Sequence, residues 1–529
     1  MRKDFAVIIA SILGLATNVS GQVGAIDPNR PHIAHAQEQE KKQKYTCLMH
    51  PEVVTDHPGN CPKCGMKLVP IKERRRSTVN EHGTSIAPPT ETHHKHDHLP
   101  PHGYSATGAH EHEKMQMEMS MHSTIDLAEP MSREGSGTSW LPDSSPMYGR
   151  MFMFGENMLM LHGAIFPRYT NVSTRRGDDR IDAPNWFMAM YSHPLGDSAQ
   201  FGARLMMSLD PLTEGGRGYP LLFQSGESWN GEPLHDRQHP HDLFDELSLS
   251  LSQKFDQDLS AYIYFGYPGE PALGPPTFMH RPSAMDDPDA PIGHHWQDST
   301  HVTFGVATAG LVWNNVKIEG SIFTGREPDE DRYNFDQPDF DSYSGRLSWN
   351  PTRNLALQVS YGYIKSPEAL EPELNRHRTT ASLIYNVPLG NDSNWSNSFV
   401  WGQNHDTAGQ GKTQSFLVES DYQRGRDTVY FRWERVEKSG DELVLNTAAN
   451  TRVFPVGAYT LGYVRDLSHG DGLDIGLGTQ FTINSRPETL DRYYGDGLGY
   501  AFEFFLRIRP SLHSHSEHDH AEPVAGMQE

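Results

Sequence analysis

The three cysteines of this 529-residue chain all lie in one short stretch, YTCLMHPEVVTDHPGNCPKCGMKLVPI, which spans residues 45–71. With one histidine they form two ligand pairs, Cys47-x2-His50 and Cys61-x2-Cys64, separated by a loop of ten residues. Two such pairs are the usual way in which a small segment surrounds one metal ion with four thiolate or imidazole ligands. The spacing therefore predicts a tetrahedral metal site.

Two thioethers, Met49 and Met66, stand next to these ligands in the sequence. Thiolate and imidazole suit Zn(II), whereas added thioether sulfur shifts the preference toward Cu(I) or Ag(I), so copper and zinc are the expected ions. A segment this short cannot bury enough apolar surface to fold alone, and bound metal would supply much of its folding free energy. The alternative is that Cys61 and Cys64 form a redox pair or a disulfide.

The stretch resembles a known family at these residues. YTCLMHPEV followed by PGNCPKCGMKLVP is similar to the heavy-metal-binding domain found on copper-transporting P-type ATPases and on periplasmic adaptors of copper and silver efflux pumps. The resemblance implies metal binding by the cysteines and histidine named above, with the two methionines as additional ligands. Leu48 stands where the family usually has proline, which leaves the ligand set intact.

The segments around this module indicate an exported protein. Residues 1–25 have a basic start, an apolar core and a small-residue cleavage site, as in a signal peptide, and residues 34–36 offer an alternative cut. Residues 26–44 read as a flexible leader. The net charge of −23 argues against nucleic acid as a partner, because phosphates require a basic surface.

Residues 72–145 have few large apolar residues and no periodicity, which predicts a disordered linker. Histidines and alternating methionines fill it, and such residues suit copper, nickel, zinc or silver ions. They are His82, His93, His94, His96, His98, His102, His110, His112, His122, Met115, Met117, Met119 and Met121. The tail at residues 510–529 repeats the theme with four more histidines. The alternative for the linker is a polar tether whose histidines bind nothing.

Residues 146–509 read as many short strands with period-two alternation, bounded by Gly, Pro, Asn or Asp. In residues 500–509 aromatic and aliphatic side chains alternate with Glu503, Arg507 and Arg509, which suits a strand between lipid and a polar lumen. The fold class predicted is mainly β: a large antiparallel β-barrel of outer-membrane type with about fourteen to sixteen strands. Tryptophans near strand ends, including Trp349 and Trp395, are expected to form interface girdles. A soluble propeller or sandwich is the competing fold.

Two further patterns lie inside the predicted barrel. Methionines spaced by two share a strand face and would either line the lumen or, as we favour, face lipid or fill packing gaps; they are Met151, Met153, Met158, Met160, Met188 and Met190. Two long loops are rich in imidazoles and carboxylates that could converge on one site or form ordinary hydrogen bonds. These loop residues are His235, Asp236, His239, His241, Asp242, His280, His294, His295, Asp298 and His301.

These patterns favour a non-enzymatic outer-membrane protein of a Gram-negative bacterium that binds heavy metal, most simply copper, in homeostasis or resistance. Its metal-binding module would be periplasmic, and metal efflux or P-type ATPase components would be its partners. The layout resembles outer-membrane copper-resistance proteins that join a Met/His-rich leader to a barrel. The alternatives are a metal-dependent enzyme with its site at residues 235–301 and a soluble periplasmic metal sponge.

Overall fold

The computed structural model describes two units of the chain, which are treated separately below. The first unit is described at residues 45–46, 54–55, 62–63 and 69–70, and the second at residues 121–390, 392–407, 411–446, 449–450, 452–470 and 472–512. None of the helices in these ranges is long and apolar enough to cross a membrane.

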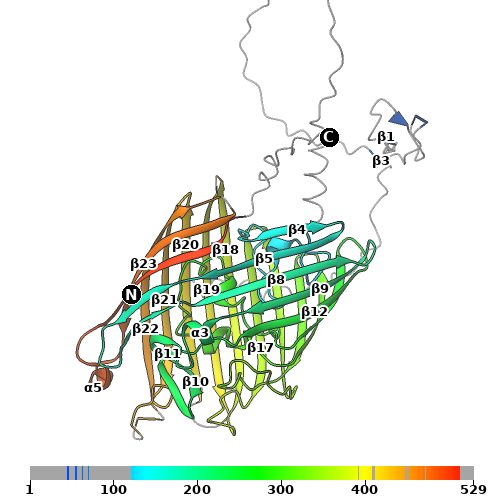
Figure 1. The fold of residues 1–529 in the computed structure, drawn as a ribbon. Helices are drawn as coiled ribbons and strands as arrows, with labels where there is room; N and C mark the ends of the chain where they lie inside the picture. Colours follow the sequence, from blue (N-terminus) through cyan, green and yellow to red (C-terminus); the bar gives the residue numbers. More distant parts are fainter. Residues whose placement is uncertain are drawn as a thin grey trace, which may run out of the picture. The chain divides into compact units, whose positions relative to one another are not determined.

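The second unit is a closed antiparallel barrel (Figure 1). Its wall strands are β4 (Arg150–Phe154), β5 (Asn157–Ile165), β6 (Arg168–Val172), β7 (Asp179–Asp182), β8 (Asn185–Pro194), β9 (Ala199–Met207), β12 (Phe244–Lys254), β13 (Leu259–Gly266), β14 (Val306–Trp313), β15 (Val316–Phe323), β16 (Ser342–Thr352), β17 (Leu355–Lys365), β18 (Asn375–Gly390), β19 (Ser393–Asp406), β20 (Lys412–Arg424), β21 (Asp427–Ser439), β22 (Val453–Ser468), β23 (Leu473–Ser485) and β24 (Gly499–Pro510). Because β5 continues into β6, β7 continues into β8, and β4 extends the line of β24 along the edge of β5, the described wall is a sixteen-strand barrel, at the upper end of the predicted range.

Pairing between the last strand and the first closes the barrel. β24 pairs with β6, from Ala501 opposite Val172 to Phe505 opposite Arg168, and reaches β5 where Ile508 lies opposite Ile165. Beyond the end of β24, Tyr148 and Leu512 form an isolated bridge. β4, which follows Tyr148, then continues the pairing along the same edge of β5. Closure leaves no long unpaired edge, which is why a sheet of this size can stand in lipid.

Side chains alternate across the wall as the sequence predicts. On β24, Phe502 and Phe504 are about half exposed on the outer surface, whereas Glu503 and Arg507 are buried inside. On β12, Leu249 and its alternate neighbours face outward and the intervening serines face inward. An apolar exterior around a polar interior is the pattern of a membrane barrel, and it excludes the soluble metal sponge.

Aromatic side chains gather on the outer surface near one end of the strands. Trp313 of β14 and Trp349 of β16 are exposed, and both lie opposite Val316 of β15, which runs between these strands. Farther around the wall, Trp395 pairs with Tyr422. Trp349 and Trp395 thus lie on the outer surface near the strand ends, as the predicted girdle requires, and their place at the membrane interface stays a prediction.

The two ends of the barrel differ in their connections. Short turns, such as residues 314–315, 353–354 and 425–426, join strands at the end where β4 and Leu512 lie. Long connections leave the other end and include α3 (Asp210–Thr213), the hairpin of β10 (Tyr219–Trp229) with β11 (Glu232–Gln238), and η4 (Glu488–Leu490) with α5 (Asp491–Tyr494). Figure 1 shows β10 and β11 at the end opposite β4.

Two segments fold into the lumen and fill it. The first, residues 121–148, contains η1 (Met131–Arg133), and the second, residues 267–305, contains η2 (Phe278–His280), α4 (His294–Gln297) and η3 (Ser299–His301). The described part of the first segment corrects the predicted linker boundary. Residues 121–145 are packed inside the barrel, because Ile125 and Trp140 join its core and polar groups pair with the wall. The remainder of the predicted linker lies outside the described residues.

Buried ion pairs hold both segments against the wall. From residues 267–305, Arg281 contacts Glu419 of β20 at 2.9 Å, and Asp287 contacts Arg432 of β21 at 3.0 Å. From residues 121–148, Glu134 pairs with Arg204 of β9. Charges on the inner face, which have no role in a dry core, therefore act as anchors for inserted chain.

Candidate metal-binding sites

In the first unit, three two-residue strands form a small sheet. β1 (Tyr45–Thr46) lies between β2 (Val54–Thr55) and β3 (Val69–Pro70), with antiparallel pairing on both sides. Pro62 and Lys63 form an exposed turn between the two closely spaced cysteines of the sequence. The six predicted ligands, Cys47, Met49, His50, Cys61, Cys64 and Met66, lie outside the described residues, so their ligand geometry stays a prediction.

The second predicted site lies in the barrel, where the structure brings together five histidines from the two long loops. His294 is central, with ring centroids 5.3 Å from His295, 5.1 Å from His301 and 6.2 Å from His239. His241 lies beside His301, with centroids 5.3 Å apart. We call these five residues the histidine cluster. Residues about 60 positions apart in sequence meet here because residues 267–305 fold back into the lumen.

Each ring of the histidine cluster has its Nδ1 atom held by an oxygen. His294 Nδ1 lies 2.6 Å from Asp298, His295 Nδ1 3.2 Å from Glu327, and His239 Nδ1 3.1 Å from Glu227. Such contacts fix ring orientation and tautomer, as carboxylates do behind metal-bound histidines. The arrangement leaves Nε2 as the nitrogen available to a ligand.

In three of these rings Nε2 is indeed buried without a hydrogen-bond partner in the described structure: His239, His294 and His295. Burial lowers the pKa of His295 to about 3 and lowers the pKa of His239 and of His294 as well, so all three are neutral at pH 7. Neutral imidazole is the form that binds metal. Unsatisfied buried nitrogens are costly, which makes a ligand at this cluster chemically reasonable.

The other two rings satisfy each other. His241 Nε2 lies 3.2 Å from His301 Nε2, and His301 Nδ1 lies 2.9 Å from the carbonyl oxygen of Asp298. Burial lowers the pKa of His241, but its 2.8 Å contact with Asp210 and the nearby carboxylate of Asp245 outweigh burial and raise that pKa to about 9. A protonated His241 donating to neutral His301 explains this pair as ordinary hydrogen bonding.

Fewer potential metal ligands come together in one place than the ten loop residues predicted from the sequence. Among the described residues, three ligand atoms come within 4.8 Å of one another in two places: His295 with Glu327 and Glu368, and Asp466 with His469 and Asp474. His295 and Glu368 of the first set line a cavity of about 290 Å³ at the long-loop end. The Nε2 atoms of His239, His294 and His295 do not form such a set, so they do not converge on one ion in the described structure.

Some predicted loop residues lie elsewhere. His235 and Asp236 contact each other and Arg176, outside the histidine cluster. His280 lies against His162 and Trp186 of the wall. Sequence reasoning missed the carboxylates behind the rings, Glu227 and Glu327, because no local spacing connects them to a histidine.

Comparison with known proteins identifies the first unit. Residues 44–71 match the model of the heavy metal binding domain family. This segment is a heavy metal binding domain. Over 27 residues the chain is 74% identical to a copper-transporting P-type ATPase of Rhizobium leguminosarum bv. viciae, a stretch that makes up 5% of this chain and 3% of that protein. The domain boundaries agree with the stretch recognised from its ligand spacing.

Solved barrels are similar to the second unit in fold. An anion-selective porin from Comamonas acidovorans has 12% identity and a TM-score of 0.39, with coverage of 67% of this chain and 99% of the porin. OmpF of Salmonella typhi, in a complex with daunomycin, has 11% identity and a TM-score of 0.42, with coverage of 68% and 100%. OprB of Pseudomonas putida has 10% identity and a TM-score of 0.40, with coverage of 66% and 94%.

Proposed function

We propose that this protein is a non-enzymatic metal-handling protein of the Gram-negative outer membrane, which captures copper with its heavy metal binding domain in homeostasis or resistance. The observation that carries the proposal is the fusion, in one chain, of that domain with a closed membrane-type barrel. A domain that binds a heavy metal gains little from a membrane barrel unless the ion is handled at that membrane.

Copper is favoured over zinc by the chemistry of the domain. Met49 and Met66 add thioether sulfur to a Cys/His ligand set, which suits Cu(I) better than Zn(II). The matching stretch belongs, in the relative, to a protein named for copper transport. We therefore take Cu(I) as the cargo, and a P-type ATPase or efflux component as the partner that exchanges it.

Topology supports a periplasmic position for the domain. The described part of the barrel unit begins at residue 121 and ends at residue 512, and Tyr148 and Leu512 pair at the short-turn end of the barrel. In bacterial barrels the short turns are periplasmic and the long loops extracellular. In this orientation both His-rich ends of the sequence enter the periplasm. Protease added to intact cells should then leave residues 26–120 uncut, and cleavage there would contradict the orientation.

Copper tolerance tests the function in cells. A deletion strain of the parent bacterium should become more sensitive to copper salts, and expression of the wild-type chain should restore growth. A chain with Cys47, Cys61 and Cys64 replaced by serine should reach the outer membrane in equal amount and fail to restore it. Equal copper tolerance of the deletion and wild-type strains would contradict the proposal. A defect restricted to zinc would contradict the assignment of the cargo.

A further inference from the structure

Methionine is distributed unevenly in the barrel. All the methionines of the barrel unit between residues 121 and 512 lie before residue 286, and residues 286–526 contain none. Most of them form one cluster inside the lumen: Met121, Met131, Met147, Met151, Met158, Met160, Met188, Met190, Met206 and Met279. Methionine used only as a flexible filler would serve any irregular gap around the wall. Concentration in one sector therefore calls for another reason.

Strand register places these side chains in adjacent rows on the inner face of the wall. Met160 of β5 lies opposite Met190 of β8, and His162 of β5 lies opposite Met188. Met188 in turn lies opposite Met206 of β9. Paired positions bring side chains of neighbouring strands within a few ångströms of each other. We expected these methionines to face lipid or to fill packing gaps. Met158, Met160, Met188 and Met190 are buried and pack together, so they do not face lipid, whereas Met153 is exposed.

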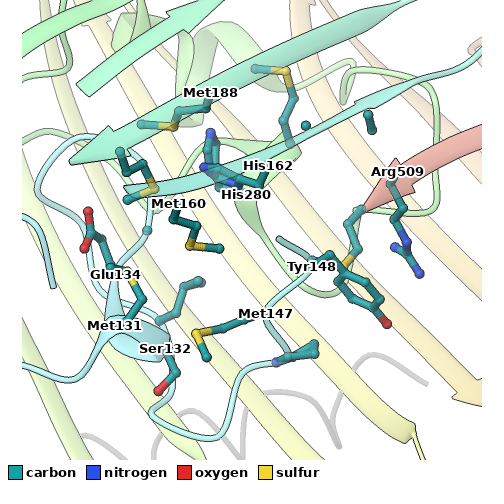
Figure 2. Close-up of a pocket in the computed structure, with 18 of the residues that line it drawn as sticks. Met131, Ser132, Glu134, Met147, Tyr148, Met160, His162, Met188, His280 and Arg509 are labelled. Carbon is teal, nitrogen blue, oxygen red and sulfur yellow. The ribbon is translucent and has the colours of Figure 1, made fainter. Parts of the chain in front are cut away.

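A cavity of about 90 Å³ opens within this cluster. Its lining includes Met160, Met188 and His162 from the wall, together with Met279 and His280 from η2 (Figure 2). The first inserted segment supplies Met131 and Met147 to the same lining. One water molecule has about 30 Å³ of liquid volume, so a single ion fits here without displacing a side chain.

Both imidazoles of the cavity have an unused nitrogen. Nε2 of His162 and Nε2 of His280 are buried and lack a hydrogen-bond partner among the described residues. The two ring centroids are 5.6 Å apart, and each ring packs on Trp186, at 5.1 Å and 4.8 Å. An indole face attracts a cation, and a buried nitrogen without a partner favours a ligand that accepts its lone pair.

The charges at the cavity select the kind of cation. Glu134 is the carboxylate of the lining, and it is already paired with Arg204 and bonded to Thr124. Arg509 also lines the cavity. Hard divalent ions require oxygen ligands and negative charge, which this wall does not offer. Thioethers and neutral imidazole suit a soft monovalent ion.

We propose that this cavity is a binding site for Cu(I) or Ag(I), with Met160 and Met188 as thioether ligands and His162 or His280 as the imidazole ligand. The inference rests on the proposed function for the source of its ion. The sequence row Met115, Met117, Met119 and Met121 ends at Met121, which packs against the same cluster. A smaller cavity of about 30 Å³ shares Trp186, Met279 and Met285 with this one and is also lined by His239 and His241. Thioether side chains thus extend from Met121 inside the lumen toward the histidine cluster.

The experiment is a titration of the full-length protein in detergent with Ag(I), which has no redox chemistry to complicate the result. Methionine labelled with ¹³C at the ε-methyl group gives one NMR signal per residue, and Met160→Leu and Met188→Leu assign the two cavity signals. We expect these signals to shift with Ag(I) and to stay unchanged with Zn(II). The Met160→Leu/Met188→Leu chain should lose one tightly bound Ag(I), whereas Met153→Leu/Met207→Leu, outside the cavity, should lose none.

Leucine conserves the volume of methionine, and retained heat-modifiable gel mobility would show that the variants fold. Unshifted cavity signals at saturating Ag(I), with Met49 and Met66 shifting, would overturn the site and leave the proposed function standing. Shifted cavity signals with Met49 and Met66 unchanged would support the site and count against capture by the heavy metal binding domain. The two failures are therefore distinguishable.

Discussion

Two sectors of the barrel wall present different chemistry to the lumen. The methionine sector, on β5, β8 and β9, carries thioethers and surrounds a cavity. The ionic sector, on β15 to β24, carries buried charges such as Arg346, Glu419 and Arg432, which pair with other charges of the wall or with the inserted segments. Both sectors have the same apolar exterior, so the membrane does not dictate the difference. The ionic sector holds inserted chain in place with many buried charges, whereas the methionine sector contributes Arg204 as an anchor and leaves space for a ligand.

Replacement of Arg281, which anchors residues 267–305 to the ionic sector, should give the largest loss of stability. Its guanidinium is fully buried between Asp298 at 2.6 Å and Glu419 at 2.9 Å. Replacement by methionine removes the arginine partner of two buried carboxylates, of which Glu419 keeps Arg432 and Asp298 keeps His294. We expect a loss of about 3–5 kcal/mol in the free energy of unfolding. Arg465→Met is the matched control, since its pair with Asp427 is exposed to solvent and should contribute little to stability. Equal denaturation midpoints for the two variants would contradict the anchoring role.

The same substitution on the lipid-facing surface should cost the same stability in both sectors. Leu161 on β5 and Leu347 on β16 are 40% and 44% exposed on the lipid-facing surface. Arginine at either position should cost about 2–4 kcal/mol if it lies near the middle of the membrane. Unfolding in lipid vesicles would measure both. A cost confined to one sector would show that the two exteriors are not equivalent.

Stability should depend on pH through His241 at the long-loop end. Its folded-state pKa of about 9 exceeds the ordinary value of 6.5 because Asp210 and Asp245 outweigh burial. A raised histidine pKa stabilises the fold fully below pH 6.5, and this contribution, up to about 3 kcal/mol, is lost as the pH rises through 9. Asp210→Asn should flatten the dependence measured by denaturation at pH 6 and pH 10. An unchanged slope would exclude the His241–Asp210 contact as its cause.

The smallest effect is expected in the methionine sector. Met190→Leu and Met206→Leu conserve volume and should each cost less than about 1.5 kcal/mol, because neither side chain is needed for anchoring. Denaturation of the metal-free protein measures this cost. Losses as large as that of Arg281→Met would show that the thioethers serve packing, and the division between the sectors would not hold.

Much of the fold follows from local pattern. Alternation of Phe502 and Phe504 with Glu503 and Arg507 predicts a strand between lipid and a polar lumen, because the side-chain period of a strand is two. Gly425 likewise predicts the short hairpin turn between β20, which ends at Arg424, and β21, which begins at Asp427. Ligand spacing likewise identifies the heavy metal binding domain without any tertiary information.

Other features depend on contacts between residues distant in sequence. Residues 121–145 look disordered because their polar groups are too many for a core of their own. They find partners on the wall, as Thr138 does with Glu319 at 2.5 Å. The pairing of His239 with Glu227 is set by how the connection that carries β10 and β11 folds, and the contact of His162 with His280 by how residues 267–305 enter the lumen. Period-two methionines showed a shared face, but could not show which face was inside.

The central claim is that the heavy metal binding domain of this barrel protein holds a soft metal ion. Its most direct test is titration of the purified full-length protein with Cu(I) and with Zn(II), against a chain in which Cys47, Cys61 and Cys64 are serine, under a chelator strong enough to mask the His-rich segments. We predict that the serine chain loses one tight Cu(I) equivalent and that Cu(I) is bound in preference to Zn(II). Identical Cu(I) binding by the two chains would contradict the account.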